Sequence, residues 1–203
     1  MALAVPELGD DAVRLRLPTT RDVDAITDAC QDPDIPRFTR IPSRYERTHA
    51  DAWVALTADG WAAETEAAFV IVDAHDDDAL LGSTGLMRLD EERNVAEIGY
   101  WVAKAARRRG IATRAVKLAS RWAVCDLGVR RLELMTHIDN AASQRVAQAA
   151  GFTREGVLRS YVTLGCGPSD VVMFSLLPSD LEGSPPETRV GSLHCRGSSE
   201  ADG

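Results

Sequence analysis

The sequence predicts an α+β fold, with a mixed, mostly antiparallel sheet flanked by helices. Three strand-like segments follow one another at residues 67–73, 80–89 and 95–103. Polar turns separate them, and strands joined by short turns are typical of an antiparallel meander. Apolar residues at helical spacing occur on both sides of this meander, so helices are expected to cover the sheet.

The segment before the meander predicts one strand and two helices. Residues 13–17 alternate between apolar and charged side chains, as in a half-buried strand. Thr19 or Thr20 is expected to cap a helix over residues 22–30, which two following prolines end. Thr48 is expected to cap the second helix. The side chains expected on its buried side are Ala50, Trp53, Val54 and Leu56.

The segment after the meander predicts two further helices, a strand and a hairpin. Apolar residues recur at helical spacing from Ile111, and this helix is expected to end near Gly128. Asn140 is expected to open the next helix and Gly151 to end it. The strand and the closing hairpin are expected at residues 131–136, 161–164 and 170–177.

The chain of 203 residues is long enough for one domain with tails. Residues 1–12 are expected to form a loose lead-in and residues 13–182 the domain. Residues 183–203 are rich in Gly, Ser and Pro, and a disordered C-terminal tail is expected there.

Composition and charge exclude several classes of protein. The content of 45% hydrophobic and 27% charged residues is that of a soluble globular protein, without an apolar run that could span a membrane. The net charge of -8 argues against general nucleic-acid binding. The N-terminus lacks the features of a signal peptide, and the 4 cysteines are scattered without metal-ligand spacing. A cytoplasmic protein with free thiols and no metal site is therefore expected.

One basic segment differs from the rest of this acidic chain. Residues 98–125 contain no acidic side chain. The basic residues of this segment are Lys104, Arg107, Arg108, Arg109, Arg114, Lys117 and Arg121. A strand leads here into a loop with Gly110 and then a helix, where free amides and the helix dipole both favour an anion. The amides of residues 108–113 predict a polyphosphate site, and the alternative is a solvated basic loop.

Taken in order, these elements and motifs resemble the GNAT superfamily of acetyl-CoA-dependent N-acetyltransferases, and more narrowly its RimJ/RimL-like branch. The likeness spans residues 13–181. The acyl-CoA motif Gln/Arg-x-x-Gly-x-Gly/Ala stands here as Arg-Arg-Arg-Gly-Ile-Ala at residues 107–112. The branch's Asn-x-x-Ser motif stands at residues 140–143, followed by Gly-Phe at residues 151–152.

The resemblance implies that acetyl-CoA is the co-substrate, held where the strands at residues 95–103 and 131–136 splay apart. The cofactor-binding residues that it implies are Val102, Arg107, Arg108, Arg109, Gly110, Ile111, Ala112, Thr113, Asn140 and Ser143. A backbone amide at or near Val102 would polarise the thioester carbonyl. Ser143 is also a candidate acid for the departing thiolate. The alternative for both Asn140 and Ser143 is a capping role at the start of the helix, for which both residue types are suited.

Glu97 is the candidate general base. Strand alternation places it on the same face as Gly99 and Trp101, where a carboxylate can sit in a cleft and act through a water. In several GNAT members a glutamate at this strand position accepts the proton of the amine. The alternative is an exposed strand residue paired with an arginine, and Glu133 is the rival carboxylate.

The expected function is direct transfer of acetyl to a primary amine. No cysteine lies within a motif, which agrees with a reaction that has no covalent enzyme intermediate. The resemblance favours the α-amine of a protein or peptide, and the alternatives are a small amine, such as an antibiotic or metabolite, or a non-catalytic acyl-CoA sensor. Tyr161 is expected in the acceptor pocket or the core, and His137 in a loop. The expected partner is an amine substrate, without nucleic acid or membrane, for a monomer or homodimer.

Overall fold

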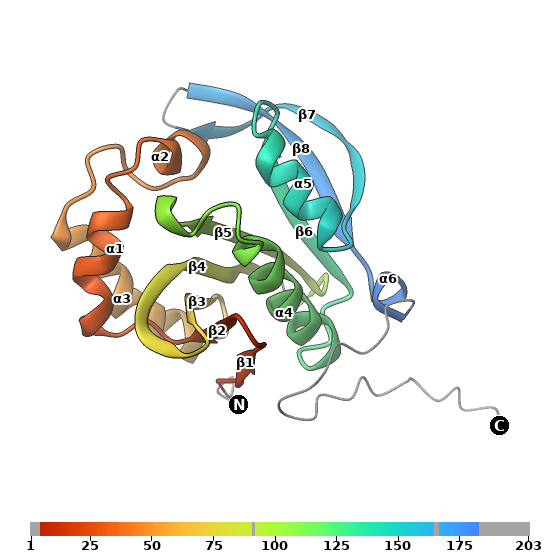
Figure 1. Ribbon diagram of the computed structural model, residues 1–203. Coiled ribbons are helices and arrows are strands. Elements are labelled where there is room, and N and C mark those ends of the chain that lie inside the picture. Colours follow the sequence, from red (N-terminus) through yellow and green to blue (C-terminus); the bar gives the residue numbers. More distant parts are fainter. Residues whose placement is uncertain (1–4, 91, 165–166, 183–203) are drawn as a thin grey trace.

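An eight-stranded sheet forms the centre of the molecule. The computed structural model describes residues 5–90, 92–164 and 167–182. The strands are β1 (Leu8–Gly9), β2 (Val13–Arg16), β3 (Ala67–Asp73), β4 (Asp76–Asp90), β5 (Val95–Val102), β6 (Arg131–His137), β7 (Thr153–Leu164) and β8 (Gly167–Leu176). They lie in the order β1-β2-β3-β4-β5-β6-β8-β7 (Figure 1). Every neighbouring pair is antiparallel except β5 and β6, which run parallel.

Helices cover both faces of this sheet (Figure 1). They are α1 (Val23–Ala29), α2 (Asp34–Phe38), α3 (Arg47–Ala62), α4 (Ile111–Cys125), α5 (Ala141–Ala149) and α6 (Pro178–Glu182), with 3-10 turns at Thr20–Asp22 and Lys104–Ala106. α4 packs on the face that carries Phe69 and Ile71, whereas α1 and α3 pack on the face that carries Val70 and Val72. Both faces of β3 are therefore buried, which explains why its sequence is apolar almost throughout.

The two central strands β5 and β6 pair only at their beginnings. The parallel ladder joins Val95 to Arg131, Ala96 to Leu132 and Glu97 to Glu133. Beyond Glu97 the strands diverge, because β5 continues along β4 and β6 continues along β8. The expected splay between central strands is therefore present, and it begins one residue after Glu97.

The α+β fold is confirmed, with the meander of β3, β4 and β5 and helices α1, α3, α4 and α5 at the expected places. α2 and α6 were not predicted. The lead-in is not loose throughout, because Leu8–Gly9 forms β1 and Leu8 is buried. Arg114 of α4 also pairs with Asp10 and Asp11 at 2.8 and 2.6 Å. The expected disordered tail at residues 183–203 lies outside the described residues.

Three smaller expectations are wrong. α3 is capped by Glu46 and not by Thr48, and the Glu46 N–H donates to Nδ1 of His49 at 2.9 Å. Leu56, which was expected on the buried side of α3, is 64% exposed. Cys30 is a buried free thiol as expected, whereas Cys125 is disulfide-bonded.

We predict that Gly82→Ala destabilises the fold and displaces the end of β5. A Cβ at Gly82 would lie 2.2 Å from the carbonyl oxygen of Trp101 and 3.0 Å from Cα of Val102, so one of the strands must move. The expected cost is about 1–3 kcal/mol of unfolding free energy, as for other overpacked sites. Gly156→Ala is the control, since a Cβ there meets nothing within 4 Å. Equal melting temperatures of the two variants would contradict the prediction.

Candidate active site

A cleft of about 1,020 Å³ opens at the splay between β5 and β6. Its walls come from the loop before α4, the first turn of α5, β5 itself and the segment from α1 to α3. The expected site residues that line it are Glu97, Val102, Arg107, Arg108, Gly110, Ile111, Ala112, Thr113, Asn140 and Ser143. Arg109 is not part of the lining, and its Nη2 lies 3.8 Å from a carboxylate oxygen of Asp73. The structure thus brings the other expected residues to one place.

The backbone of the loop before α4 is tightly coiled. Arg108 and Gly110 both have left-handed backbone angles, with φ of 62° and 78°. Gly110 is the N-cap residue of α4, and a Cβ built on it meets no heavy atom within 4 Å. The space at this helix N-terminus is therefore open, and the first amides of α4 have no intrahelical partners. A diphosphate fits such a site, because these amides and the helix dipole both favour negative charge.

The guanidinium group of Arg107 is committed to protein partners. Its Nε donates to the carbonyl of Val102 at 3.2 Å, its Nη1 donates to Asp34 at 3.1 Å and its Nη2 donates to Asp32. Arg107 therefore ties the loop to the segment between α1 and α2. Arg108 is exposed and forms no ion pair with the described residues, so its charge remains available to a ligand.

The N–H group of Val102 points toward the splay. The N–H of the next residue, Ala103, donates to the carbonyl of Leu81 on β4 at 2.9 Å. Successive residues of a strand direct their N–H groups to opposite sides, so the N–H of Val102 faces the space that β6 leaves. The Val102 carbonyl lies on this same side and accepts a hydrogen bond from Nε of Arg107. A thioester carbonyl placed in the splay would meet this donor.

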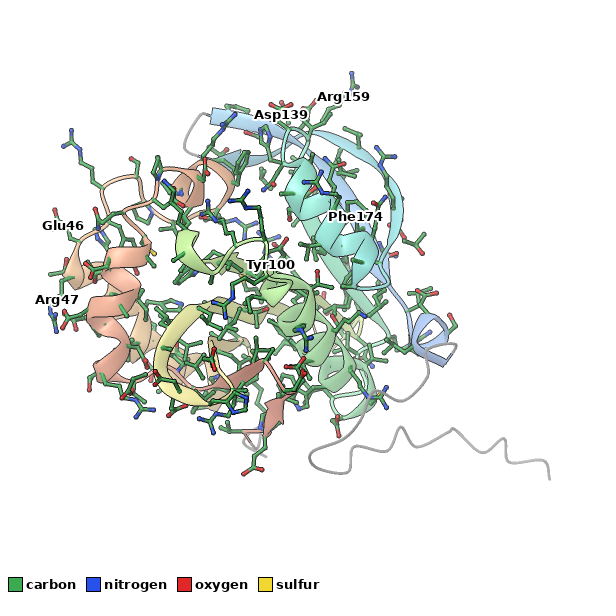
Figure 2. The ribbon with its side chains drawn as sticks, viewed as in Figure 1. Glu46, Arg47, Tyr100, Asp139, Arg159 and Phe174 are labelled. Atoms are coloured by element: carbon green, nitrogen blue, oxygen red, sulfur yellow. The ribbon has the colours of Figure 1, made fainter. Side chains whose placement is uncertain are left out.

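Asn140 and Ser143 form the first turn of α5. Asn140 is the N-cap, and its Oδ1 accepts a hydrogen bond from the N–H of Ser143 at 3.0 Å. The hydroxyl of Ser143 lies 2.8 Å from the phenol oxygen of Tyr100, which comes from β5 on the other side of the splay. Tyr100 lies near the centre of the molecule (Figure 2). Burial raises the pKa of Tyr100 to about 12, although the hydrogen bond to Ser143 acts in the opposite direction.

Glu97 lies at the inner end of the cleft, where the strands begin to diverge. Its side chain is 10% exposed, and its Oε1 lies 3.6 Å from Nη1 of Arg40, beyond hydrogen-bond distance. Its Oε2 lies 3.2 Å from Nη1 of Arg88, but the angle does not make a hydrogen bond, and this buried oxygen has no hydrogen-bond partner among the described residues. Glu97 is thus a carboxylate with neighbouring positive charge and unused acceptor capacity.

The other residues considered for the site lie elsewhere or have structural contacts. Glu133 accepts from Nε of Arg131 at 2.8 Å and does not line the cleft. Tyr161 is 51% exposed, so it belongs neither to the acceptor pocket nor to the core. His137 ends β6 rather than lying in a loop, and its Nδ1 accepts from the N–H of Asp139 at 3.1 Å.

The wall of the cleft opposite the α4 loop is mainly apolar and aromatic. The apolar residues that line it are Ile26, Phe38, Ile41, Tyr45, Trp53, Leu56 and Trp101. The carboxylates that line the whole cleft are Asp34, Glu66 and Glu97, and Asp34 is held by Arg107. This wall offers contact area for an apolar group and few negative charges.

Two features of the site could not be predicted from the sequence. The Tyr100–Ser143 bond joins residues 43 positions apart, and no local pattern indicates that they meet. Arg88 has a left-handed backbone with φ of 52°, at an irregularity between Met87 and Asp90 in the pairing of β4 with β5. This irregularity changes the alternation of β4, so the guanidinium of Arg88 reaches Glu97.

Comparison with known proteins identifies the family. Residues 12–153 match the family described as "Acetyltransferase (GNAT) domain". The chain belongs to the GNAT acetyltransferase family. It is therefore an acetyl-CoA-dependent N-acetyltransferase.

Individual relatives and solved structures show what the chain is similar to. The N-acetyltransferase p20 of Bacillus licheniformis is 25% identical over 173 residues, which cover 85% of this chain and 97% of that protein. The ribosomal-protein-serine acetyltransferase of Escherichia coli is 28% identical over 99 residues, which cover 49% of this chain and 55% of that protein. The structure of Mycobacterium smegmatis RimJ in complex with CoA-disulfide superimposes with a TM-score of 0.78, at 23% identity, over 89% of this chain and 90% of that chain.

Within the described residues, no helix has the length and apolar character needed to cross a membrane. The same part of the chain contains no group of three or more His, Cys, Asp or Glu side chains arranged to hold a metal ion.

We predict that Gly110→Asp weakens acetyl-CoA binding far more than Gly110→Asn. Both side chains tolerate the left-handed backbone of this position better than other residues, and the open space accepts either. They differ in the negative charge, which would repel a phosphate at the helix N-terminus. Calorimetry should show at least a roughly tenfold difference in Kd, or about 1.4 kcal/mol. Equal affinities of two folded variants would mean that the phosphates bind elsewhere.

Proposed function

We propose that this enzyme transfers acetyl from acetyl-CoA to the α-amine of a protein or peptide N-terminus, with Glu97 as general base. The observation that carries the proposal is the carboxylate of Glu97, which lines the cleft at the point of strand divergence with unused hydrogen-bond capacity. An ammonium group donates hydrogen bonds in several directions and would supply the missing donors.

The reaction follows from the groups that line the cleft. The ammonium gives one proton to Glu97, directly or through a water, and the free amine nitrogen forms a bond to the carbonyl carbon. The same nitrogen loses its second proton to water as the amide forms. The N–H of Val102 stabilises the negative charge that develops on the carbonyl oxygen. The carbon–sulfur bond then breaks, and its electron pair leaves with the sulfur as thiolate. Ser143 lies on the opposite side of the splay from Val102, where its hydroxyl can donate to that sulfur.

The amides at the start of α4 would hold the diphosphate of acetyl-CoA. Gly110, Ala112 and Thr113 line this part of the cleft, and Arg108 adds an exposed positive charge. The pantetheine arm would then lie in the splay, beside the unpaired edges of β5 and β6.

The apolar and aromatic wall of the cleft, or acceptor wall, supports an amine substrate with a single amine group. A polyamine or a polycationic antibiotic carries several positive charges, and each would need a carboxylate to replace its hydration. Here Asp34 is already paired with Arg107, so Glu66 and Glu97 are the remaining carboxylates of the lining. The α-amine of a peptide has one charge next to a side chain, which Phe38 or Trp53 can contact. A relative that acetylates ribosomal protein agrees with this choice.

A small monoamine is the second candidate, because the same aromatic wall would also bind an apolar monoamine. The sensor alternative would require that no carboxylate reaches the acyl-CoA cleft. Glu97 lines that cleft, so the structure does not favour a sensor.

We predict that Glu97→Gln reduces turnover by roughly 10²–10⁴-fold, which is typical for the loss of a general base, without changing the Kd for acetyl-CoA. The defect should shrink as the pH rises, because free amine then forms without help. For an α-amine, with a pKa of about 7.7–8.0, the defect should largely disappear above that range, whereas for an alkylamine it should persist to about pH 10.

The acceptor panel for this test contains peptides with a free α-amine, the same peptides with a blocked N-terminus and one lysine, and small monoamines. Thiol release is measured for each with the wild-type enzyme and with Glu97→Gln. Glu133→Gln is the matched control and should retain turnover, because Glu133 lies outside the cleft. Turnover with lysine but not with the α-amine would contradict the proposed acceptor, and an unchanged rate in Glu97→Gln would contradict the proposed base.

A further inference from the structure

One side-chain hydrogen bond crosses the open part of the splay. It joins the phenol oxygen of Tyr100, on β5, to the hydroxyl of Ser143, on α5, at 2.8 Å. Both residues line the cleft. Either oxygen can be the donor in this geometry. The direction of the bond decides which of the two hydroxyls has a hydrogen left for the ligand in the splay.

We propose that Tyr100 is a positioning residue for acetyl transfer: its phenol donates to Oγ of Ser143, and the hydroxyl hydrogen of Ser143 is thereby directed to the sulfur of the thioester. The proposal rests on the proposed function, since it places the leaving group of that reaction beside Ser143. The leaving thiolate then meets the hydroxyl of Ser143 on α5, and the hydroxyl of Tyr100 on β5 holds that hydroxyl in place.

This direction leaves a free hydroxyl hydrogen on Ser143. Its backbone N–H is already bound to Oδ1 of Asn140, so the position of its Cβ is fixed by the helix cap. A serine hydroxyl has one hydrogen and two acceptor sites, and it rotates freely unless a neighbour restricts it. A phenol that donates to Oγ occupies one acceptor site and leaves the hydrogen of Ser143 for another partner. Tyr100 therefore acts through Ser143 and not on the sulfur.

The difference between the pKa values of the phenol and the thiol excludes a full proton transfer from Tyr100 to the thiolate. Burial raises the pKa of this phenol to about 12, whereas a thiol has a pKa of about 8.5. Moving a proton from the phenol to the thiolate would therefore be unfavourable by more than about a thousandfold. The carbon–sulfur bond breaks, the electron pair stays on sulfur, and the hydrogen bond from Ser143 stabilises the charge without transfer. The proton that the thiolate finally takes is the one that the amine released, delivered through Glu97 and water.

Tyr100→Phe removes the hydroxyl alone, and the ring still packs against the core. We expect kcat to fall roughly tenfold, with the KM for acetyl-CoA unchanged, because only the leaving-group contact is lost. Ser143→Ala should lower kcat by at least as much. The double variant should be no worse than Ser143→Ala, since Tyr100 acts only through Ser143. Tyr161→Phe is the matched control, because Tyr161 is exposed and lies outside the cleft.

A binding measurement tests the same contact without turnover and without an acceptor. Calorimetry at about pH 9 compares CoA with desulfo-CoA, which lacks the sulfur. At this pH a free thiol is largely ionised, while the phenol of Tyr100 stays protonated. The wild-type enzyme should prefer CoA, Ser143→Ala should lose the preference, and Tyr100→Phe should lose most of it. Should Tyr100→Phe not fold, Tyr100→Met removes the hydroxyl with a more adaptable side chain.

Three results would overturn the proposal. One is a preference for CoA in Tyr100→Phe equal to that of the wild type. Another is a double variant whose kcat defect is the product of the two single defects, which would mean that the hydroxyls act independently. The third is a loss in Tyr100→Phe that greatly exceeds the loss in Ser143→Ala, which would reverse the roles of donor and acceptor. Failure of the proposed acceptor is distinguishable, because it would leave the CoA and desulfo-CoA affinities as expected.

Discussion

The early end of the β5–β6 ladder is the constraint on which the site depends. After Glu97 and Glu133, the edges of both strands lose their partners, and backbone groups that a sheet normally pairs must find other acceptors and donors. The divergence thus creates a cavity and a set of backbone donors in one step. Two side-chain contacts hold the splay between β5 and β6 at a fixed width. The Tyr100–Ser143 hydrogen bond joins its two sides, and Arg107 holds the end of β5.

Most arginines of the basic segment that first indicated a polyphosphate site form ion pairs with other parts of the protein. Arg107 binds Asp32 and Asp34, and Arg114 binds Asp10 and Asp11. These acidic residues come from distant parts of the chain and compensate a segment that has none of its own. Anion binding at α4 then depends mainly on amides and on Gly110, with Arg108 as the exposed charge. Fixed amides need no side-chain ordering when the ligand arrives, which favours them over flexible arginines.

The sequence predicted what local chemistry decides and missed what tertiary contacts decide. Strand-like apolar segments located β3 and β5, and the loop glycine Gly110 followed by helical spacing from Ile111 marked the start of α4. The α3 cap was missed because threonine is a favoured capping residue and glutamate is not, whereas the capping box of Glu46 with His49 starts the helix one residue before Thr48. Arg88 was missed because an irregularity in β4 redirects its side chain, and an alternation argument assumes a regular strand.

Arg107 connects the two halves of the cleft, and this changes how its variants must be interpreted. Asp32 is 7% exposed, and its carboxylate depends on Arg107 for a charged partner. Removing that partner leaves a buried carboxylate without a compensating charge. For a fully buried ion pair this lowers the free energy of unfolding by about 3–5 kcal/mol, and the loss is smaller here because Arg107 is partly exposed. The penalty falls on the segment between α1 and α2, which lies in the chain between the wall residues Ile26 and Phe38. A fall in acetyl-CoA affinity in an Arg107 variant would therefore not identify a phosphate contact, because the same change loosens Val102 and the acceptor wall together.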